Sequence, residues 1–400
     1  MRILVVSRSG LPFPSPTGGA EMLALRQAMG LADAGADVVV VGQGTLPAHN
    51  GPGSLRLVEV GVRGTTTSSR RALYYAKVLL FAVAAGVRGA QVLRRDRSIE
   101  IVHSHHSATV LVLRALAPRR PVVHTVHDNP YDPNDPVPSV FERAVRVLNN
   151  LLLERLGIRL SDHVIAVSPE IDLRLKEWGV SGAKVTEIWP TAAKRSGTAN
   201  GPVEDSPGPV PGPNHPYLLS VGDLTGRKRM DLLVESLKEL PAEMRLVIVG
   251  RGPDRRALDQ EVRSLGLNGR VTILDYVSSA HLTALQRGAI ACVLASEREG
   301  LPTSLIEAVR EGTPCVYATV QSVSLPDTEP FLAHLVANSP VEVASEIRKV
   351  VSLTGTGGAT REQVRRWAEA RFPDPDAVAQ RLLGLYAGLL ASSRAGPSAA

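Results

Sequence analysis

Short apolar runs alternate with longer segments of helical periodicity along the first half of the chain. The apolar runs are rich in Val and Ile and predict buried strands at residues 2–7, 37–42, 55–60, 100–104, 121–127, 163–167 and 184–189. The segments between them predict helices at residues 19–34, 70–95, 106–117, 139–159 and 169–178. Strands that alternate with helices are typical of an α/β fold with a doubly wound parallel sheet.

A second alternating series follows a change in composition. Residues 194–214 are rich in Gly, Pro, Ser and Asn, which cannot form a core, so this stretch is interpreted as a linker. The second series runs from Tyr217 to about Phe372, and a last helical pattern covers Ala377 to Leu390. A chain of 400 residues with 44% apolar content can bury two cores. We therefore predict a first domain at 1–193, a linker at 194–214, a second domain at 215–372 and a terminal segment at 373–400.

The stretch from Ser296 to Ala308 has the pattern of a ligand site. It follows an apolar run at 290–295 and predicts a strand, a turn and a helix, with Pro302 in the first helical turn. Glu299 and Glu307 lie at most about 12 Å apart along that helix. Backbone N–H groups of Gly300 to Ser304 would point at an anion, so a ligand with two hydroxylated rings joined by a diphosphate fits the span. The alternative is that both glutamates are solvated charges at a helix end.

The order of motifs around this stretch resembles the family 4 glycosyltransferases. The motifs are Leu246-Val247-Ile248-Val249-Gly250-Arg251-Gly252-Pro253, Leu265-Gly266-Leu267, Val271 to Val277, Ser296 to Glu307 with its Glu-x7-Glu pair, and Gly312-Thr313-Pro314. The resemblance implies the glycosyltransferase-B architecture, in which two Rossmann-like doubly wound domains face a cleft. It also implies that the last helix crosses back onto the first domain. The implied reaction is transfer of a sugar from a nucleoside diphosphate to an acceptor hydroxyl with retention of anomeric configuration.

The resemblance assigns residues to that reaction. His127, Lys228 and Glu299 are the implied catalytic residues. The implied donor-binding residues are Gly18, Gly19, Arg227, Lys228, Gly250, Tyr276, Glu299, Gly300, Leu301, Thr303, Ser304 and Glu307. Two of these motifs have a plain structural alternative, because paired glycines also form tight turns and a lysine such as Lys228 can be a solvated cation at a helix start.

This chain departs from the family pattern beside Lys228. Asp223 stands where the family has an arginine, and Arg229 stands where it has a glycine. A carboxylate next to a diphosphate is repulsive. We therefore expect either that Arg227 or Arg229 supplies the missing charge, or that Asp223 turns into solvent.

The histidines do not predict a metal site. Alternation along a strand places His124 and His127 on opposite faces, and no Cys or carboxylate has a supporting spacing. His103 is expected to order its neighbouring loop. Asp374-Pro375-Asp376 precedes a predicted helix and fits capping better than manganese binding. We expect no metal and no cofactor, with a UDP-sugar favoured over a GDP-sugar as substrate.

Composition narrows the setting of the protein. Cys292 and Cys315 lie in apolar runs and are expected to be buried free thiols in a reducing compartment. The first strand-like run is too short for an export signal, and no stretch reaches the length of a spanning helix. Arginine accounts for 38 of the 45 basic residues, which suggests a high-GC bacterial gene. The expected location is either cytoplasmic or peripheral on the inner face of the membrane. The expected partners are a nucleotide-sugar donor and a small-molecule or lipid acceptor, with no nucleic-acid partner.

The charge is concentrated in the first half of the chain. Residues 1–200 contain 24 Lys and Arg against 16 Asp and Glu, a net of +8, whereas residues 201–400 have 21 against 23, a net of −2. Basic residues flank the apolar stretch from Ala72 to Gly86. One interpretation is a core-packed helix with arginines that snorkel at its ends. The other is a peripheral helix that holds the first domain against anionic lipid.

Two other functions share this architecture. A sugar-nucleotide 2-epimerase would turn over the nucleotide sugar with no acceptor present. A non-catalytic scaffold would fit Asp223 as a sign of decay and would bind nucleotide weakly or not at all.

Overall fold

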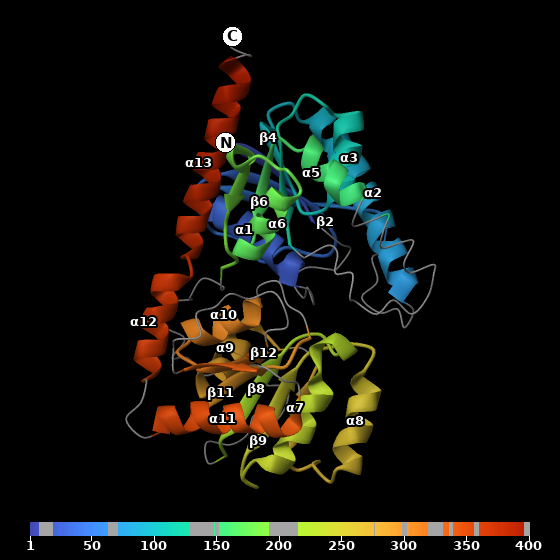
Figure 1. Cartoon of the computed structure of the whole chain (residues 1–400). Coiled ribbons are helices and arrows are strands. Elements are labelled where there is room, and N and C mark those ends of the chain that lie inside the picture. The colour runs from blue at the N-terminus through green and yellow to red at the C-terminus, as the bar shows by residue number, and fades with distance from the viewer. Residues whose placement is uncertain are drawn as a thin grey trace. The chain divides into compact units, whose positions relative to one another are not determined.

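The computed structural model describes two compact units of the chain (Figure 1). One comprises Met1–Pro190 with Asp374–Ala400, and the other comprises Thr191–Pro373. The structure describes residues 1–7, 19–62, 71–127, 148, 152–191, 215–275, 277–297, 302–318, 331–335, 339–355 and 360–395. The predicted linker at 194–214 lies outside these residues.

The first unit contains a parallel sheet in the order β3-β2-β1-β4-β5-β6-β7. Its strands are β1 (Arg2–Val6), β2 (Asp37–Gly42), β3 (Ser54–Glu59), β4 (Ile101–Ser104), β5 (Val122–Val126), β6 (His163–Ala166) and β7 (Val185–Glu187). The order reverses between β1 and β4. All seven strands begin and end within two residues of the positions that the apolar runs predict, and the doubly wound α/β fold class is confirmed.

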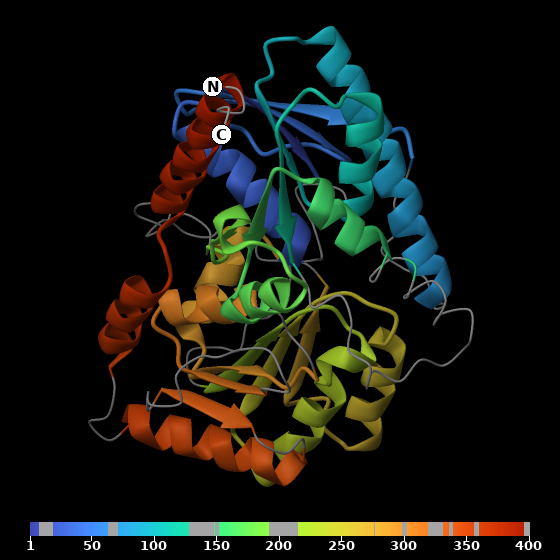
Figure 2. The same ribbon diagram turned by 45° about the horizontal axis from the view of Figure 1, so that its top comes forward.

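Helices cover both faces of this sheet (Figure 2). They are α1 (Gly19–Asp33), α2 (Arg71–Arg95), α3 (Ser107–Leu116), α5 (Glu154–Leu160), α6 (Pro169–Glu177) and α13 (Pro375–Ala395). Ile3 and Val5 of β1 share a core with α1 and α13, whereas Leu4 and Val6 share another with α2 and α3. Successive strand residues point to opposite faces, so an apolar run without alternation is required where both faces are covered.

The C-terminal helix α13 belongs to the first unit. Val378, Leu382 and Tyr386 are buried in the same core as β1. Tyr386 Oη also forms a hydrogen bond of 2.7 Å with His103 Nδ1 on β4. At the start of α13, the backbone N–H of Asp376 donates to Asp374 Oδ1, so Asp374 caps the helix as predicted.

The second unit contains a parallel sheet in the order β10-β9-β8-β11-β12-β13. Its strands are β8 (Tyr217–Val221), β9 (Arg245–Val249), β10 (Val271–Leu274), β11 (Ala291–Leu294), β12 (Cys315–Ala318) and β13 (Leu332–Leu335). Its helices are α7 (Met230–Ser236), α8 (Arg255–Ser264), α9 (Ser279–Gly288), α10 (Thr303–Arg310), α11 (Pro340–Gly355) and α12 (Arg361–Arg371). Cys292 and Cys315 lie side by side on β11 and β12 as buried free thiols, and burial raises the pKa of Cys315.

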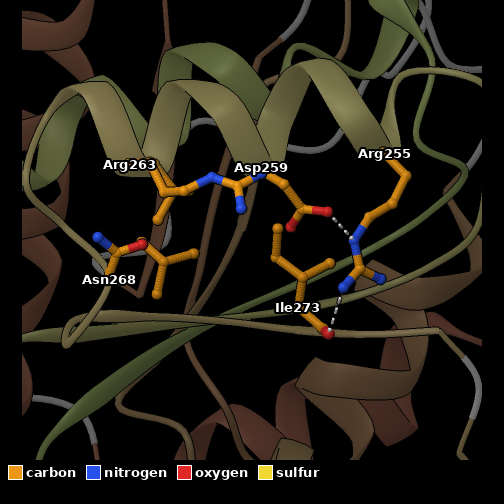
Figure 3. Close-up of a pocket in the computed structure, with 7 residues that line it drawn as sticks. Arg255, Asp259, Arg263, Asn268 and Ile273 are labelled. Carbon is orange, nitrogen blue, oxygen red and sulfur yellow. Dashed lines mark hydrogen bonds and ion pairs between the residues drawn. The ribbon is translucent and has the colours of Figure 1, made fainter.

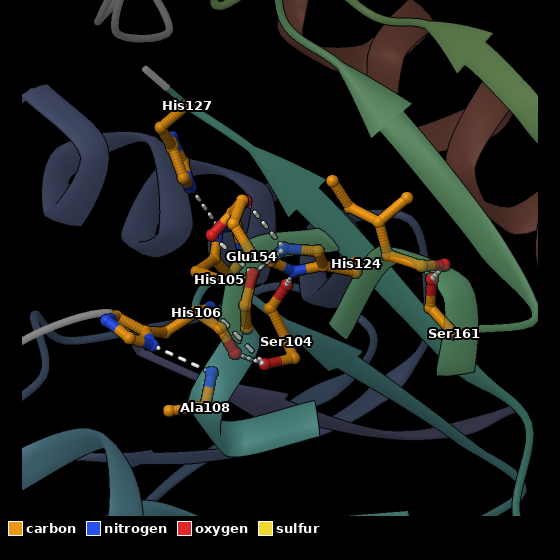
Figure 4. A network of polar contacts seen from close by, with 10 residues as sticks. Ser104, His105, His106, Ala108, His124, His127, Glu154 and Ser161 are labelled. Carbon is orange, nitrogen blue, oxygen red and sulfur yellow. Dashed lines mark hydrogen bonds and ion pairs between the residues drawn. The ribbon is translucent and has the colours of Figure 1, made fainter. Parts of the chain in front are cut away.

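A buried polar network joins β5 to α3 and α5 (Figure 4). His124 Nδ1 lies 3.1 Å from the Ser104 carbonyl oxygen, and its Nε2 lies 2.8 Å from Ser107 Oγ and 3.3 Å from Glu154 Oε1. Ser107 Oγ donates to Glu154 Oε2 at 2.5 Å. Both ring nitrogens of His124 therefore lie within hydrogen-bond distance of oxygen atoms, so the buried ring is fixed on both sides.

Glu154 is the counter-charge of this network, with its side chain 19% exposed. Burial raises the pKa of the Glu154 carboxyl. The hydrogen bond and charge of His124, together with the Ser107 hydrogen bond and the charge of His106, outweigh burial and hold the pKa at about 2. A carboxyl whose pKa is lowered by folding stabilises the native state above its unfolded pKa, and that stabilisation disappears as pH falls to the folded pKa.

We therefore expect Glu154→Gln to destabilise the protein by about 3 kcal/mol at neutral pH, because it leaves the buried His124 without its counter-charge. The difference in the free energy of unfolding between the variant and the wild type should become smaller as pH falls from the ordinary glutamate pKa of 4.5 toward the native pKa of about 2. Thermal melts of both proteins between neutral and acid pH measure it. Glu170→Gln, which removes a half-exposed helical ion pair with Arg174, is the matched control and should change little. A difference that does not depend on pH would contradict the assignment.

Candidate functional site

The second sheet reverses its order between β8 and β11, which are neighbours. In open parallel sheets, ligands bind outside the carboxyl ends of the strands at such a reversal. The segment after β8 begins at Gly222, and the segment after β11 contains Ser296 and Glu297. The two segments are joined directly, because the Glu297 backbone N–H donates to the Arg227 carbonyl oxygen at 2.8 Å.

Lys228 lies at the carboxyl end of β8. Gly226–Lys228 form a single turn of 3-10 helix that brings the lysine side chain back over Gly222. A Cβ added to Gly222 would lie 3.2 Å from Lys228 Cε and 3.4 Å from Nζ. Because Gly222 has no side chain, the lysine stem can lie against the end of the strand and hold its ammonium group there.

The segments after β8 and β9 are in van der Waals contact through glycines. A Cβ on Gly250 would lie 1.9 Å from the Gly222 carbonyl oxygen, and one on Gly252 would lie 2.1 Å from the Leu224 carbonyl oxygen. Gly250 was predicted to bind the donor. That role stays a prediction, and the structure adds a packing reason for the residue, since only glycine allows this backbone approach.

Arg229 occupies a left-handed backbone conformation with φ 48° and ψ 45°. This is the position where the resembled family has a glycine, and a left-handed residue explains why. The Arg229 guanidinium lies 3.2 Å from Asp231 Oδ2 and 3.9 Å from Glu297 Oε1. Its charge is thus shared with two carboxylates, so Arg229 can offset the charge of Asp223 only in part.

Helix α10 begins at Thr303, close after β11. Pro302 occupies the N-cap position, one residue before the first turn in which it was predicted. Leu305, Ile306, Ala308 and Val309 bury the inner face of α10 and fix its direction. Thr303 and Ser304 are half-buried in the first turn, where helical N–H groups have no intrahelical acceptor and the macrodipole is positive.

Glu307 is half-buried one turn further along α10. Gln286 Nε2 on α9 donates to Glu307 Oε2 at 3.4 Å, and the Thr313 hydroxyl donates to the Gln286 carbonyl oxygen at 2.5 Å. Gln286 therefore helps to orient the glutamate. The sequence carried no signal for this residue, because an isolated glutamine in a helix has no motif.

Three histidines, His103, His105 and His127, gather on one face of the first sheet, and Figure 4 shows two of them, His105 and His127. His105 Nδ1 lies 2.8 Å from His127 Nε2, and the His103 ring stacks on His105 with centroids 4.5 Å apart. His103 Nε2 also pairs with Thr125 Oγ1 at 2.6 Å, opposite its bond to Tyr386. Burial, with a smaller effect of the charge of His124, lowers the pKa of His103 to about 3. His103 is therefore neutral, and it links β5 to α13 rather than ordering a loop as predicted.

His127 is the predicted catalytic histidine, and its contact with His105 was not predicted. Strand alternation could have indicated it, because residues 103, 105 and 127 share one face. His124 has the separate partners described above, which agrees with the predicted opposite orientation of His124 and His127.

Several predicted site residues lie outside the described part of the chain. They are Gly18, Tyr276, Glu299, Gly300 and Leu301. Gly19 is the first residue of α1. Among the described residues, no group of three or more His, Cys, Asp and Glu side chains is arranged to hold a metal ion.

A hollow of about 280 Å³ lies between α8 and β10 (Figure 3). Arg255 in this hollow is bonded to Asp259, Asp275 and the Ile273 carbonyl oxygen. Strand β10 is at the edge of the sheet, two strands away from β8. The hollow is thus distinct from the reversal between β8 and β11.

The left-handed conformation of Arg229 leads to a stability prediction. Arg229→Gly should raise the free energy of unfolding by up to about 1 kcal/mol, because a side chain in this conformation costs about 1–2 kcal/mol and the ion pair lost is exposed. Arg229→Val, which is β-branched, should lower it. Thermal or urea unfolding of the three proteins decides the order, and a glycine variant less stable than the valine variant would refute it.

Two family models match the chain and together cover most of it. The model described as "Glycosyltransferase Family 4" matches residues 17–191, and that described as "Glycosyl transferases group 1" matches residues 205–325. Among curated proteins, a D-inositol 3-phosphate glycosyltransferase from Xylanimonas cellulosilytica is 28% identical over 60% of each chain. A lipopolysaccharide 1,6-galactosyltransferase from Salmonella typhimurium is 27% identical over 41% of this chain and 45% of its own. The chain thus spans about half the length of these relatives.

Solved structures resemble the whole chain in fold. The sucrose-phosphate synthase of Thermosynechococcus elongatus has a TM-score of 0.77 at 22% identity, covering 98% of this chain and all of its own. Anabaena HepE, solved in complex with UDP-glucose, has a TM-score of 0.66 at 18% identity, covering 98% of this chain and all of its own. Two parallel doubly wound sheets, the matches to both family models and these fold relatives agree with one another. The chain belongs to the family 4 glycosyltransferases and has the glycosyltransferase-B fold.

Proposed function

We propose that the protein transfers a sugar from a nucleoside diphosphate sugar to an acceptor hydroxyl with retention of anomeric configuration. The observation that carries the proposal is the positive charge at the carboxyl ends of two neighbouring strands. Lys228 Nζ lies beside Gly222 after β8, and the N-terminus of α10 follows β11. A lysine ammonium and a helix N-terminus both favour a diphosphate.

The same groups supply the catalysis in this proposal. As the bond between sugar and diphosphate breaks, negative charge develops on the leaving diphosphate. Lys228, Arg227 and the N–H groups at Thr303 and Ser304 stabilise that charge without a metal ion. Fixed donors of this kind act most strongly when they need no rearrangement, and the tight packing of Gly250 on Gly222 holds the lysine segment in place.

The two glutamates are assigned to the two rings of the donor. Glu307, oriented by Gln286, binds the ribose hydroxyls, and Glu299 binds the hydroxyls of the transferred hexose. His127 binds the same sugar near its anomeric centre, and His105 fixes the orientation of the His127 ring. A UDP-sugar is the favoured donor, in keeping with the UDP-glucose bound to Anabaena HepE.

The acceptor is proposed to be a hydroxyl of a small molecule or a lipid-linked saccharide. The relatives whose names describe an acceptor include enzymes that act on inositol 3-phosphate and on lipopolysaccharide. The proposed location of the protein is the cytoplasm, because the expected donor is a nucleotide sugar.

A donor screen followed by product analysis tests the proposal. UDP-sugars should raise the melting temperature, because ligand at a hundredfold excess over Kd adds about 2.7 kcal/mol to the free energy of unfolding. GDP- and ADP-sugars should raise the melting temperature less. Glu307→Gln should weaken this effect for free UDP, whereas Glu299→Gln should weaken it for UDP-sugar only.

Proton NMR of the product should show the anomeric configuration of the donor. An inverted anomer would refute retention, turnover of the nucleotide sugar without an acceptor would indicate an epimerase, and no nucleotide binding would indicate a scaffold.

A second prediction concerns the leaving group. Lys228→Ala should lower kcat by about 100-fold or more, as removal of other electrostatic groups does. Arg227→Ala or Arg229→Ala should also lower activity, because either guanidinium can supply the charge missing at Asp223. Asp223→Arg should be tolerated or improve nucleotide affinity. Lys238→Ala removes an exposed lysine from the turn after α7 and is the control for loss of one positive charge. Equal losses in Lys228→Ala and Lys238→Ala would contradict the role of Lys228.

A further inference from the structure

Exposed apolar side chains are concentrated on one part of the first unit. Among the residues that the structure describes, eleven large apolar side chains are exposed, and eight of them lie on α2, α3 or α5 or within the six residues before α5. They are Leu80, Val83, Val87, Leu116, Leu148, Leu152, Leu156 and Leu160, which we call the leucine face. Exposed apolar residues scattered singly are ordinary, but a concentration of this kind marks an interaction surface.

The leucine face is continuous because its three helices are neighbours (Figure 2). Helix α3 packs on α2 through Thr109, whose hydroxyl donates to the Ala82 carbonyl oxygen. On its other side α3 packs on α5, where a Cβ added to Gly157 would lie 2.6 Å from Ser107 Cβ. The sheet-facing residues of α3 are Val110 and Leu113, which are fully buried.

Helical spacing places the leucines on the outer side of these helices. Leu148, Leu152, Leu156 and Leu160 recur every fourth residue, and Leu80, Val83 and Val87 recur at three and four. Leu152 and Leu80 are 60% and 57% exposed. The inner side of α2 is equally apolar, with Phe81, Ala85 and Leu93 in the core.

Helix α2 is apolar on both its inner and its outer side. For this reason it is the one helix in the described part of the chain that is long and apolar enough to cross a membrane. The core contacts argue against a spanning helix. A Cβ on Gly86 would lie 2.7 Å from Val112 Cβ, and Phe81 has no exposed surface. Removing α2 from the sheet would expose this core to water or lipid. Helix α2 therefore remains on the sheet and offers only its outer side.

The charged side chains of the three helices are almost all basic, although Arg114 is paired with Asp162, which lies just after α5. The described side chains of α2, α3 and α5 include seven basic residues, Lys77, Arg88, Arg94, Arg95, Arg114, Arg155 and Arg159. The sole acid in these three helices is Glu154, which points inward to His124 and Ser107. A surface that combines apolar side chains with an excess of positive charge is complementary to an anionic lipid bilayer.

We propose that the leucine face is a membrane-docking surface, on which the protein lies against an anionic bilayer with α2 and α5 at the interface. The leucines insert among the lipid chains, and the arginines contact phosphate groups. Of the two interpretations of α2 that the sequence left open, the exposed side of the helix and the additional leucines before and on α5 favour the peripheral one. The proposal does not depend on the transfer reaction, and its test needs no donor or acceptor.

Vesicle sedimentation with the full chain tests the proposal. One set of vesicles is phosphatidylcholine alone, and the other contains equal parts of phosphatidylcholine and phosphatidylglycerol. The protein should sediment with the anionic vesicles only. Binding should fall by about tenfold or more when ionic strength rises from about 0.01 M to about 1 M, because the Debye length shortens from about 30 to 3 Å.

Matched variants separate the two contributions. Leu152→Ser with Leu156→Ser should lower the partition coefficient by about tenfold, since both changes remove apolar surface from the interface. Leu173→Ser on α6, where the leucine is also 60% exposed, is the control and should leave binding unchanged. Arg94→Gln with Arg95→Gln should also weaken binding, whereas Arg256→Gln with Arg263→Gln on α8 should not. All these side chains are exposed, so melting temperatures should stay close to that of the wild type.

Three outcomes would overturn the proposal. The first is no sedimentation with anionic vesicles at low ionic strength. The second is equal binding of the Leu152→Ser/Leu156→Ser protein and the Leu173→Ser protein. The third is a stable dimer in analytical ultracentrifugation that dissociates on Leu152→Ser with Leu156→Ser, because the leucine face would then belong to a second copy of the chain.

Discussion

Both faces of each parallel sheet must be covered by helices, and the rest of the structure depends on this constraint. Strands such as β1 are apolar on both sides, with Ile3 and Val5 on one face and Leu4 and Val6 on the other. The chain therefore contributes helices to both faces, and α13 returns from the end of the sequence to cover one of them. Loops remain only at the ends of the strands, where polar groups can meet water or a ligand.

The candidate donor site follows from that arrangement. At the reversal between β8 and β11, two segments leave the sheet in different directions and place Lys228 and the start of α10 after neighbouring strands. Glycines at 222, 250 and 252 let the backbones approach closely enough to keep these groups fixed. Rigid positive groups stabilise a developing diphosphate charge better than mobile ones, because no reorganisation accompanies the reaction. The left-handed Arg229 is a local cost of the same tight turn.

The first unit pairs its buried charge internally but leaves apolar side chains exposed on its surface. His124 and Glu154 lie within the unit as a hydrogen-bonded pair, which removes the only acid of α2, α3 and α5 from the outer surface. The outer sides of the same helices keep their leucines exposed. Exposed apolar side chains are unfavourable in water alone. Contact with an anionic bilayer would cover these leucines and would also suit the excess of basic side chains on the same helices.

The sequence alone determined the elements and the order of the motifs. Apolar runs placed all seven strands of the first sheet, because a strand buried on both faces needs a continuous local run such as 37–42. The Glu-x7-Glu pair and the glycines were recognisable because turns and helix starts are also set by neighbouring residues. The tertiary structure decided which strands became neighbours, and with them the pairing of His105 with His127 and of Glu154 with His124. It also decided that the leucines at 152 and 156 face outward, although their spacing would equally suit a core. Periodicity is a property of the local chain, whereas the partner of each face is set by contacts between residues far apart in the sequence.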